Sequence, residues 1–158
     1  MSHTLQSLAR DQWVTPTQGL VDIPSAIDGR VVARASSTGL DFAALVQHAR
    51  EVGGANLRAM NFHQRADLLK ALGAYLSERK EQLYALAADT GASRRDNAVD
   101  IDGGLVTLAA FASRGRRELP DTSFITEGEV EVLSKRGSFV GQHILTPLHG
   151  VAVHINAF

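Results

Sequence analysis

The chain has 158 residues and no cysteine, and this absence excludes more chemistry than any other feature of its composition. Without thiols there are no disulfides, no cysteine-ligated metal sites and no cysteine nucleophile. No stretch approaches the roughly 20 apolar residues that a membrane-spanning helix needs. Residues 1–6 lack the basic and apolar segments of a signal peptide. These absences favour a cytoplasmic protein and argue against a membrane partner.

The chain also lacks an excess of charge of either sign, because 16 basic residues nearly balance 17 acidic ones and leave a net charge of −1. Such a chain has no electrostatic basis for binding nucleic acid. Six histidines are present, but His143, His149 and His154 fall on different predicted elements. No helical His-x-x-x-His pair accompanies them. The sequence therefore predicts no metal site.

Short strands are predicted near the start of the chain. Residues 5–35 contain brief apolar stretches at 13–14, 19–23 and 30–34, separated by proline and glycine turn signals. This pattern predicts a small antiparallel meander.

Helices are predicted from Asp41 to Pro120, where apolar residues recur at spacings of three and four. The predicted N-caps are Asp41, Asn61 (in a capping box with Gln64) and Ser93. The predicted helix ends are Gly53–Gly54, Gly91 and Pro120. A break between two helices is expected at 78–81. Six leucines on the apolar stripes are expected to be mostly buried: Leu69, Leu72, Leu76, Leu83, Leu105 and Leu108.

Strand patterns return after Thr122. Residues 129–133 and 139–145 can pair as a hairpin, and residues 151–158 alternate apolar side chains in the manner of a buried strand. Because no polar or turn-forming residue follows that strand, we expect the chain to be the front part of a larger protein.

The patterns together predict an α+β fragment of an α/β parent fold, with three or four helices. Its expected parts are N-terminal strands with a helical layer at 1–128, a β ribbon at 129–147, and the beginning of a further domain at 148–158.

Two residue pairs invite a functional interpretation. Asp100 and Asp102 lie two positions apart on a predicted helix, so their side chains project about 200° from each other and do not share a site. Gly103 and Gly104 lie in a helix interior, where each costs about 1 kcal/mol relative to alanine. They indicate close packing, or a wall that must stay thin beside a cavity. Neither this pair nor Gly53–Gly54 has the spacing of a phosphate-binding loop.

Several motifs occur in a fixed order over nearly the whole chain: residues 37–41, 57–60, 90–92, 99–104, 117–121, 133–135, 143–147 and 150–158. In this order they resemble the aldehyde dehydrogenase superfamily. More narrowly, they resemble the dehydrogenase half of the bifunctional phenylacetate-degradation family called PaaZ or PaaN. The semialdehyde dehydrogenase of the benzoyl-CoA epoxidation pathway shares several of the motifs and is the alternative within the superfamily.

The resemblance implies an NAD(P)-dependent enzyme, with NADP as the expected cofactor and a CoA-linked semialdehyde as substrate. The family's cysteine nucleophile, glutamate base and oxyanion asparagine have no counterparts in these residues, so no catalytic residue is expected and the chain alone should be inactive. Residues 148–158 match the start of the NAD(P)-binding domain, with the first strand of its cofactor-binding sheet. Within them, Ile155, Asn156, Ala157 and Phe158 match the stretch beside the cofactor's nicotinamide ribose.

Two further implications follow from the same resemblance. Gly103 and Gly104 match the helix that borders the substrate tunnel, and two glycines there would widen it for a CoA thioester. The ribbon at about 129–146 matches oligomerisation strands, which implies a homo-oligomer. A different class of function stays open, a stand-alone oligomerisation or interaction module without catalysis. The unpaired edge expected at 151–158 argues against that alternative.

Overall fold

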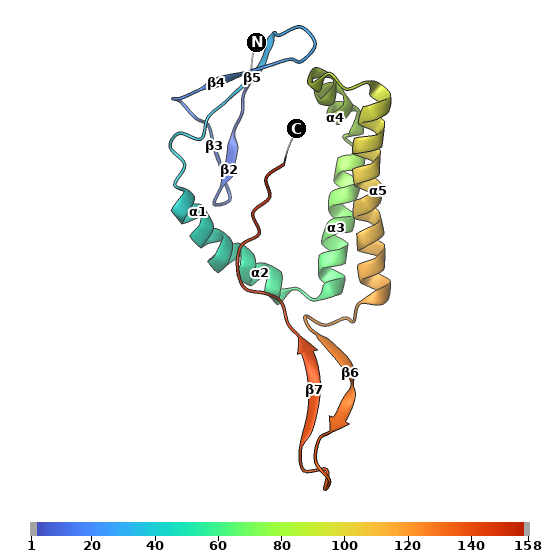
Figure 1. Cartoon of the computed structure of the whole chain (residues 1–158). Coiled ribbons are helices and arrows are strands. Elements are labelled where there is room, and N and C mark those ends of the chain that lie inside the picture. The colour runs from blue at the N-terminus through green and yellow to red at the C-terminus, as the bar shows by residue number, and fades with distance from the viewer. Residues whose placement is uncertain (1–2, 157–158) are drawn as a thin grey trace.

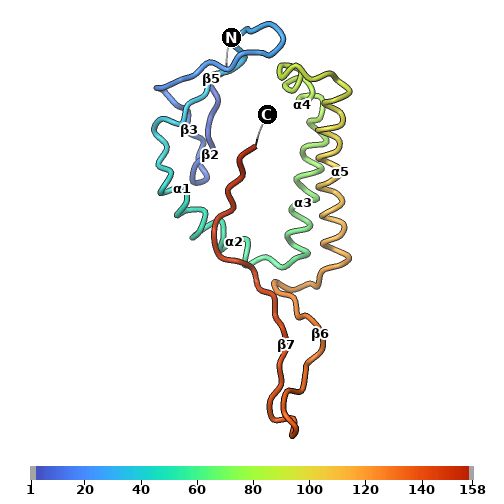
Figure 2. Tube along the Cα trace, viewed as in Figure 1, coloured from blue at the N-terminus to red at the C-terminus, as the bar shows by residue number. Residues whose placement is uncertain are grey.

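In the computed structural model, which describes residues 3–156, strands and helices form the two sides of an open arch (Figure 1). Short strands and an N-terminal helical segment make one side, and two long antiparallel helices make the other. A two-stranded ribbon projects beyond the arch, and the last described residues run back toward its centre (Figure 2). This arrangement confirms the predicted α+β class.

The N-terminal strands form two small sheets. They are β1 (His3–Thr4), β2 (Ser7–Ala9), β3 (Gln12–Val14), β4 (Val21–Pro24) and β5 (Val31–Ala35). One sheet has the order β1-β5-β4, with β1 parallel to β5, and the other is the antiparallel pair β2-β3. The prediction of a single antiparallel meander is therefore wrong, although the strand positions at 13–14, 19–23 and 30–34 are nearly right.

The hairpin β2-β3 explains that error. Its two central residues, Arg10 and Asp11, have φ values of 49° and 63°. Two consecutive left-handed residues make the tight turn whose twist suits a β-hairpin. Arg-Asp is not among the usual sequences for this turn, so the sequence did not reveal that Trp13 pairs back with Leu8.

The helices begin where capping residues predict them. They are α1 (Phe42–His48), the π-helical η1 (Ala49–Gly53), α2 (Gly54–Ala59), α3 (Phe62–Ser77), α4 (Lys80–Ala87), the 3-10 turn η2 (Ala88–Thr90) and α5 (Arg94–Glu118). The side chains of Asp41 and Ser93 accept hydrogen bonds from Ala44 N and Asp96 N. Asn61 forms the predicted capping box with Gln64. Gly91, with φ of 86°, ends η2. No helix in the described part is long and apolar enough to cross a bilayer.

Gly53 and Gly54 do not stop the first helix, contrary to the prediction. Both have right-handed helical dihedrals, with φ near −60°. A glycine ends a helix when it adopts the left-handed conformation, and neither does so here. The chain instead passes through η1 into α2 and turns out of the helix at Met60, whose ψ is 138°.

Apolar burial is small for a chain of this size. The buried hydrophobic residues of the described part are Ala9, Ala66 and Ala112. The accessible surface is 12,336 Å², against about 7,700 Å² for a compact monomer of equal mass. Of the six leucines expected to be mostly buried, Leu72 is 45% exposed and the other five are half-buried. The helical period is thus confirmed, but the predicted degree of burial is wrong because a single helix pair covers only one side of each stripe.

The ribbon consists of β6 (Ile125–Val132) and β7 (Val140–Leu145). It is antiparallel, with an irregular register between Glu127 and Glu131, so the predicted hairpin is confirmed. The predicted terminal strand is wrong over residues 151–156, which have no strand assignment. Backbone there has no neighbouring strand among the described residues with which to form a ladder. Residues 157–158 of that prediction lie outside the described part.

Candidate functional site

Gly103 and Gly104 lie in the middle of α5 and are exposed. Beyond the neighbouring backbone of α5 itself, a Cβ atom built on either glycine would meet no atom of residues 3–156 within 4 Å. Close packing inside this chain therefore does not explain them. Val99 and Val106, which share the face of Gly103 by helical spacing, are 69% and 67% exposed. This face of α5 therefore has no side-chain bulk at the glycines and exposed apolar side chains beside them, and no other part of the described chain covers it.

The proposed cofactor stretch is represented by its first two residues. Ile155 is 92% exposed and Asn156 is also exposed, on backbone without strand pairing. Ala157 and Phe158 lie outside the described residues. The structure does not bring this stretch together with Gly103 and Gly104, whose surroundings are empty to 4 Å. The role of Ile155 and Asn156 as one wall of a cofactor site therefore stays a prediction.

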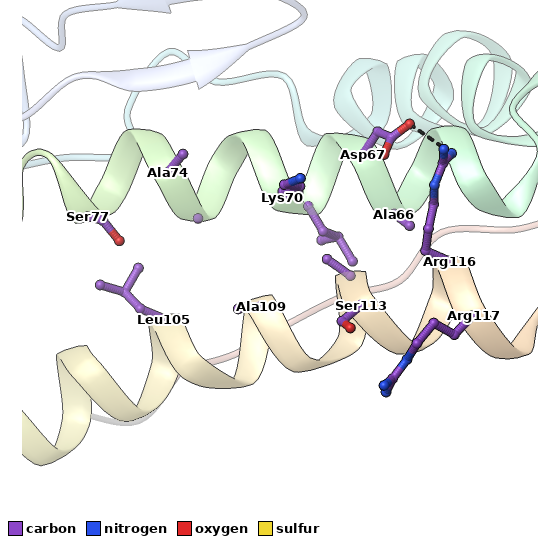
Figure 3. Close-up of a pocket in the computed structure, with 13 residues that line it drawn as sticks. Ala66, Asp67, Lys70, Ala74, Ser77, Leu105, Ala109, Ser113, Arg116 and Arg117 are labelled. Carbon is purple, nitrogen blue, oxygen red and sulfur yellow. Dashed lines mark hydrogen bonds and ion pairs between the residues drawn. The ribbon is translucent and has the colours of Figure 1, made fainter.

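A groove of about 520 Å³ lies between α3 and α5 (Figure 3). Its floor consists of small residues from both helices, including Ala66, Ala109 and Ala112. Arg116 reaches across the groove from α5 to Asp67 on α3, with 3.2 Å between Nη1 and Oδ2. The small residues let the two helices approach each other closely. The sequence patterns did not predict this groove. The alternation of alanine and leucine on both helices is the feature that could have indicated it.

A polar cluster joins α4 to α5. Lys80 Nζ lies 2.9 Å from Asp102 Oδ1, and the Tyr84 hydroxyl donates a hydrogen bond to Asp102 Oδ2 at 2.8 Å. The hydrogen bonds from Lys80 and then Tyr84 lower the pKa of Asp102 below its usual value. The hydrogen bond to Asp102 raises the pKa of Lys80, whereas desolvation is the main reason that the pKa of Tyr84 is raised.

This cluster confirms the interpretation of the two neighbouring aspartates. Asp102 is half-buried and hydrogen-bonded, while Asp100 is exposed on another side of α5. A tyrosine with a raised pKa and a carboxylate held ionised are poor candidates for acid–base exchange near neutrality. The cluster therefore links α4 to α5 and has a structural role. The sequence feature that could have indicated it is the spacing of Lys80 and Tyr84, at positions i and i+4.

The histidines are dispersed and make separate contacts. His63 lies between two acceptors, the carbonyl oxygen of Leu119 at 3.0 Å and Asp121 Oδ1 at 3.3 Å. His143 is 3.7 Å from Glu127 on the exposed ribbon. Within residues 3–156 no group of three or more His, Asp or Glu side chains is placed to hold a metal ion.

The chain belongs to the aldehyde dehydrogenase family, whose family model matches residues 13–158. Complete enzymes of this family use NAD(P). The superfamily predicted from the sequence motifs is thus confirmed.

A particular relative is the 3,4-dehydroadipyl-CoA semialdehyde dehydrogenase of Aromatoleum evansii. It is 34% identical over 148 residues, which cover 93% of this chain. The chain spans 28% of the length of that curated relative. This similarity favours the alternative within the superfamily over the narrower resemblance to the phenylacetate-degradation proteins.

Proposed function

We propose that this chain is the N-terminal portion of an NAD(P)-dependent dehydrogenase that oxidises a CoA-linked semialdehyde. The observation that carries the proposal is the 34% identity, over 93% of the chain, to an enzyme whose name gives a CoA-linked semialdehyde as its substrate. The family match over residues 13–158 supports the same class of reaction.

In this proposal, residues of the chain line one side of the cofactor site and border the substrate tunnel. Ile155 and Asn156, with Ala157 and Phe158 outside the described residues, form one side of the NAD(P) site. When bound, the cofactor accepts the hydride of the oxidation. Gly103 and Gly104 keep the surface of α5 thin beside the substrate tunnel. Their empty surroundings support this role, since a thioester-bearing substrate needs space.

The ribbon β6-β7 is proposed to join copies of the protein. A two-stranded ribbon alone is marginally stable in water. Val132 and Ile144 on its strands are 64% and 56% exposed, and Phe139, just before β7, is 64% exposed. Pairing between subunits would cover these side chains and give a homo-oligomer.

A finer alternative assigns the chain to the bifunctional phenylacetate-degradation proteins. The motifs at 99–104 and 150–158 support it, and both assignments share a CoA-linked semialdehyde. They differ in the aldehyde oxidised and in whether the protein also has a C-terminal hydratase-like domain, which is the second half of the bifunctional proteins.

A chimera tests the proposal. Residues 13–158 replace the aligned part of the A. evansii enzyme, and oxidation of its CoA-linked semialdehyde is measured with NADP and with NAD. We expect the chimera to retain a kcat/KM within about tenfold of the parent, which is a transition-state difference of roughly 1.4 kcal/mol. A matched chimera carries the corresponding segment of an aldehyde dehydrogenase that acts on free aldehydes. Equal activity of the two chimeras toward free and CoA-linked aldehydes would overturn the assignment of substrate.

A further inference from the structure

A basic cleft lies between α2 and the segment that follows the ribbon. It has a volume of about 490 Å³ and is bordered by Leu57, Arg58 and Arg65 on one side and by residues 147–152 on the other. A neighbouring hollow of about 360 Å³ is bordered by Arg50, Arg58, His149 and Gly150. Three arginines and a histidine thus border these two spaces, and no acidic residue of the described part borders either one.

Arg65 carries a buried donor without an acceptor. Its Nε donates a hydrogen bond to the Leu57 carbonyl oxygen at 3.1 Å, and its guanidinium lies 5.6 Å from the Phe62 ring centroid. Its Nη2 is buried and has no hydrogen-bond partner among the described residues. Buried donors are nearly always paired, and an unpaired charged one is costly. The second arm of this guanidinium therefore needs an acceptor.

Arg58 borders the same cleft as Arg65, and its guanidinium lies over Gly54 of α2. A Cβ atom on Gly54 would lie 3.0 Å from Arg58 Nη1, so the guanidinium folds over the glycine where a side chain would crowd it. Within residues 3–156, none of Arg50, Arg58 and Arg65 has an ion-pair partner, although eleven ion pairs occur elsewhere. The chain's net charge is −1, so this cleft is a local concentration of positive charge.

We propose that the cleft binds an oxyanion, a carboxylate or a phosphate group, through the guanidinium groups of Arg58 and Arg65. Guanidinium forks match the two oxygens of such groups, and partly buried arginines without counter-charges favour them further. In the neighbouring hollow, Arg50 adds a guanidinium group and His149 adds a ring. The site is bordered by α2, α3 and residues 147–152, and no residue of α5 borders it.

Calorimetric and thermal titrations of the 158-residue chain test this site. Inorganic phosphate, acetate and chloride are titrated at constant ionic strength. Phosphate or acetate should bind saturably and raise Tm by about 3–6 °C at ten times its Kd, whereas chloride should not. The stronger of the two anions identifies the chemistry of the group.

Two variants and a control complete the test. Arg58→Gln and Arg65→Gln should each weaken binding at least tenfold, and Arg58→Lys should weaken it less. Arg94→Gln removes an equal charge from an exposed ion pair with Glu81 and should change Kd less than twofold. If Arg65→Gln fails to fold, Arg58→Gln decides. Equal responses of Arg58→Gln and the unmodified chain, or a response that only follows ionic strength, would overturn the proposal.

Discussion

The hydroxyl of Ser25 donates a hydrogen bond to Asp89 Oδ1 at 3.0 Å, across 64 positions of sequence, and joins the strand side of the arch to the helix side. Ser25 is 3% exposed. The amide of Ala26 also donates to the Asp89 carbonyl at 2.8 Å, and Arg30 Nη2 lies 2.6 Å from Asp89 Oδ1. One aspartate therefore accepts hydrogen bonds from three groups of the β4-β5 turn.

Replacing Asp89 should lower the free energy of unfolding. Asp89→Ala leaves the buried Ser25 hydroxyl without its acceptor, which costs about 1–3 kcal/mol. Asp22→Ala breaks an exposed pair with Arg34 and should cost about 0–1 kcal/mol. Urea denaturation measures both free energies of unfolding. Equal losses for the two variants would contradict the special role of Asp89.

The joint between α4 and α5 gives stability a defined dependence on pH. The lowered pKa of Asp102 contributes stability that is present above its unfolded pKa, near 4, and is lost as the pH falls through the lowered value. The raised pKa values of Lys80 and Tyr84 contribute stability that is present below their unfolded values, near 10, and is lost as the pH rises through the raised values.

Asp102→Asn should therefore destabilise the chain most on the plateau from about pH 5 to 9 and progressively less outside it. Asp100→Asn, at the exposed neighbour, is the control and should follow the unmodified chain at every pH. Free energies of unfolding measured across this range check both variants. A constant difference between Asp102→Asn and the unmodified chain would exclude linkage through this carboxylate.

The glycines of α5 predict a gain of stability in the isolated chain. Gly103→Ala and Gly104→Ala each add a methyl group into open space and remove conformational freedom from the unfolded state, worth about 0.5–1 kcal/mol. Gly91→Ala should instead destabilise, because φ there is +86°. Thermal unfolding of the three variants measures these signs. In a catalytically competent chimera, the α5 variants should lower kcat/KM for the CoA-linked substrate if these glycines border the tunnel.

The 158-residue chain alone should not oxidise aldehydes. It contains no cysteine that could attack a carbonyl carbon and form the covalent intermediate. The measurement is the absorbance of reduced NADP with a semialdehyde substrate, and a sample supplemented with an intact aldehyde dehydrogenase shows that the assay works. A rate that scales with the concentration of the purified chain would refute this expectation.

The segment after the ribbon should promote self-association. Val153 and Ile155 are 77% and 92% exposed, next to backbone that pairs with no strand in the described part. Such apolar edges join between molecules. Light scattering at micromolar concentration should detect oligomers, and hydrogen exchange at 151–156 should be fast. Val153→Lys and Ile155→Lys should reduce the association, whereas Thr17→Lys and Gln18→Lys, at exposed positions, should not. A sharp monomer with protected amides at 151–156 would favour the stand-alone module.

Local chemistry determined much of this structure from the sequence alone. The caps at Asp41, Asn61 and Ser93 fix helix starts because a short polar side chain pairs the first free amides. The ribbon followed from its alternation, and the motifs along the chain identified the family. The break between α3 and α4 was likewise predicted at 78–81, where Arg79 leaves the helical region with ψ of 12°.

Only the tertiary structure decided which segments meet. Trp13 pairs with Leu8 because the turn at Arg10 and Asp11 is left-handed, a choice that their side chains do not signal. The sequence likewise did not indicate that Ser25 meets Asp89, or that Arg58 and Arg65 border one cleft, because contacts between distant segments depend on how the whole chain is arranged. The alternation of residues 151–156 predicted a strand, and the described structure does not form one there. A strand forms only when a neighbour supplies hydrogen bonds, and the described part of this chain has none at that place.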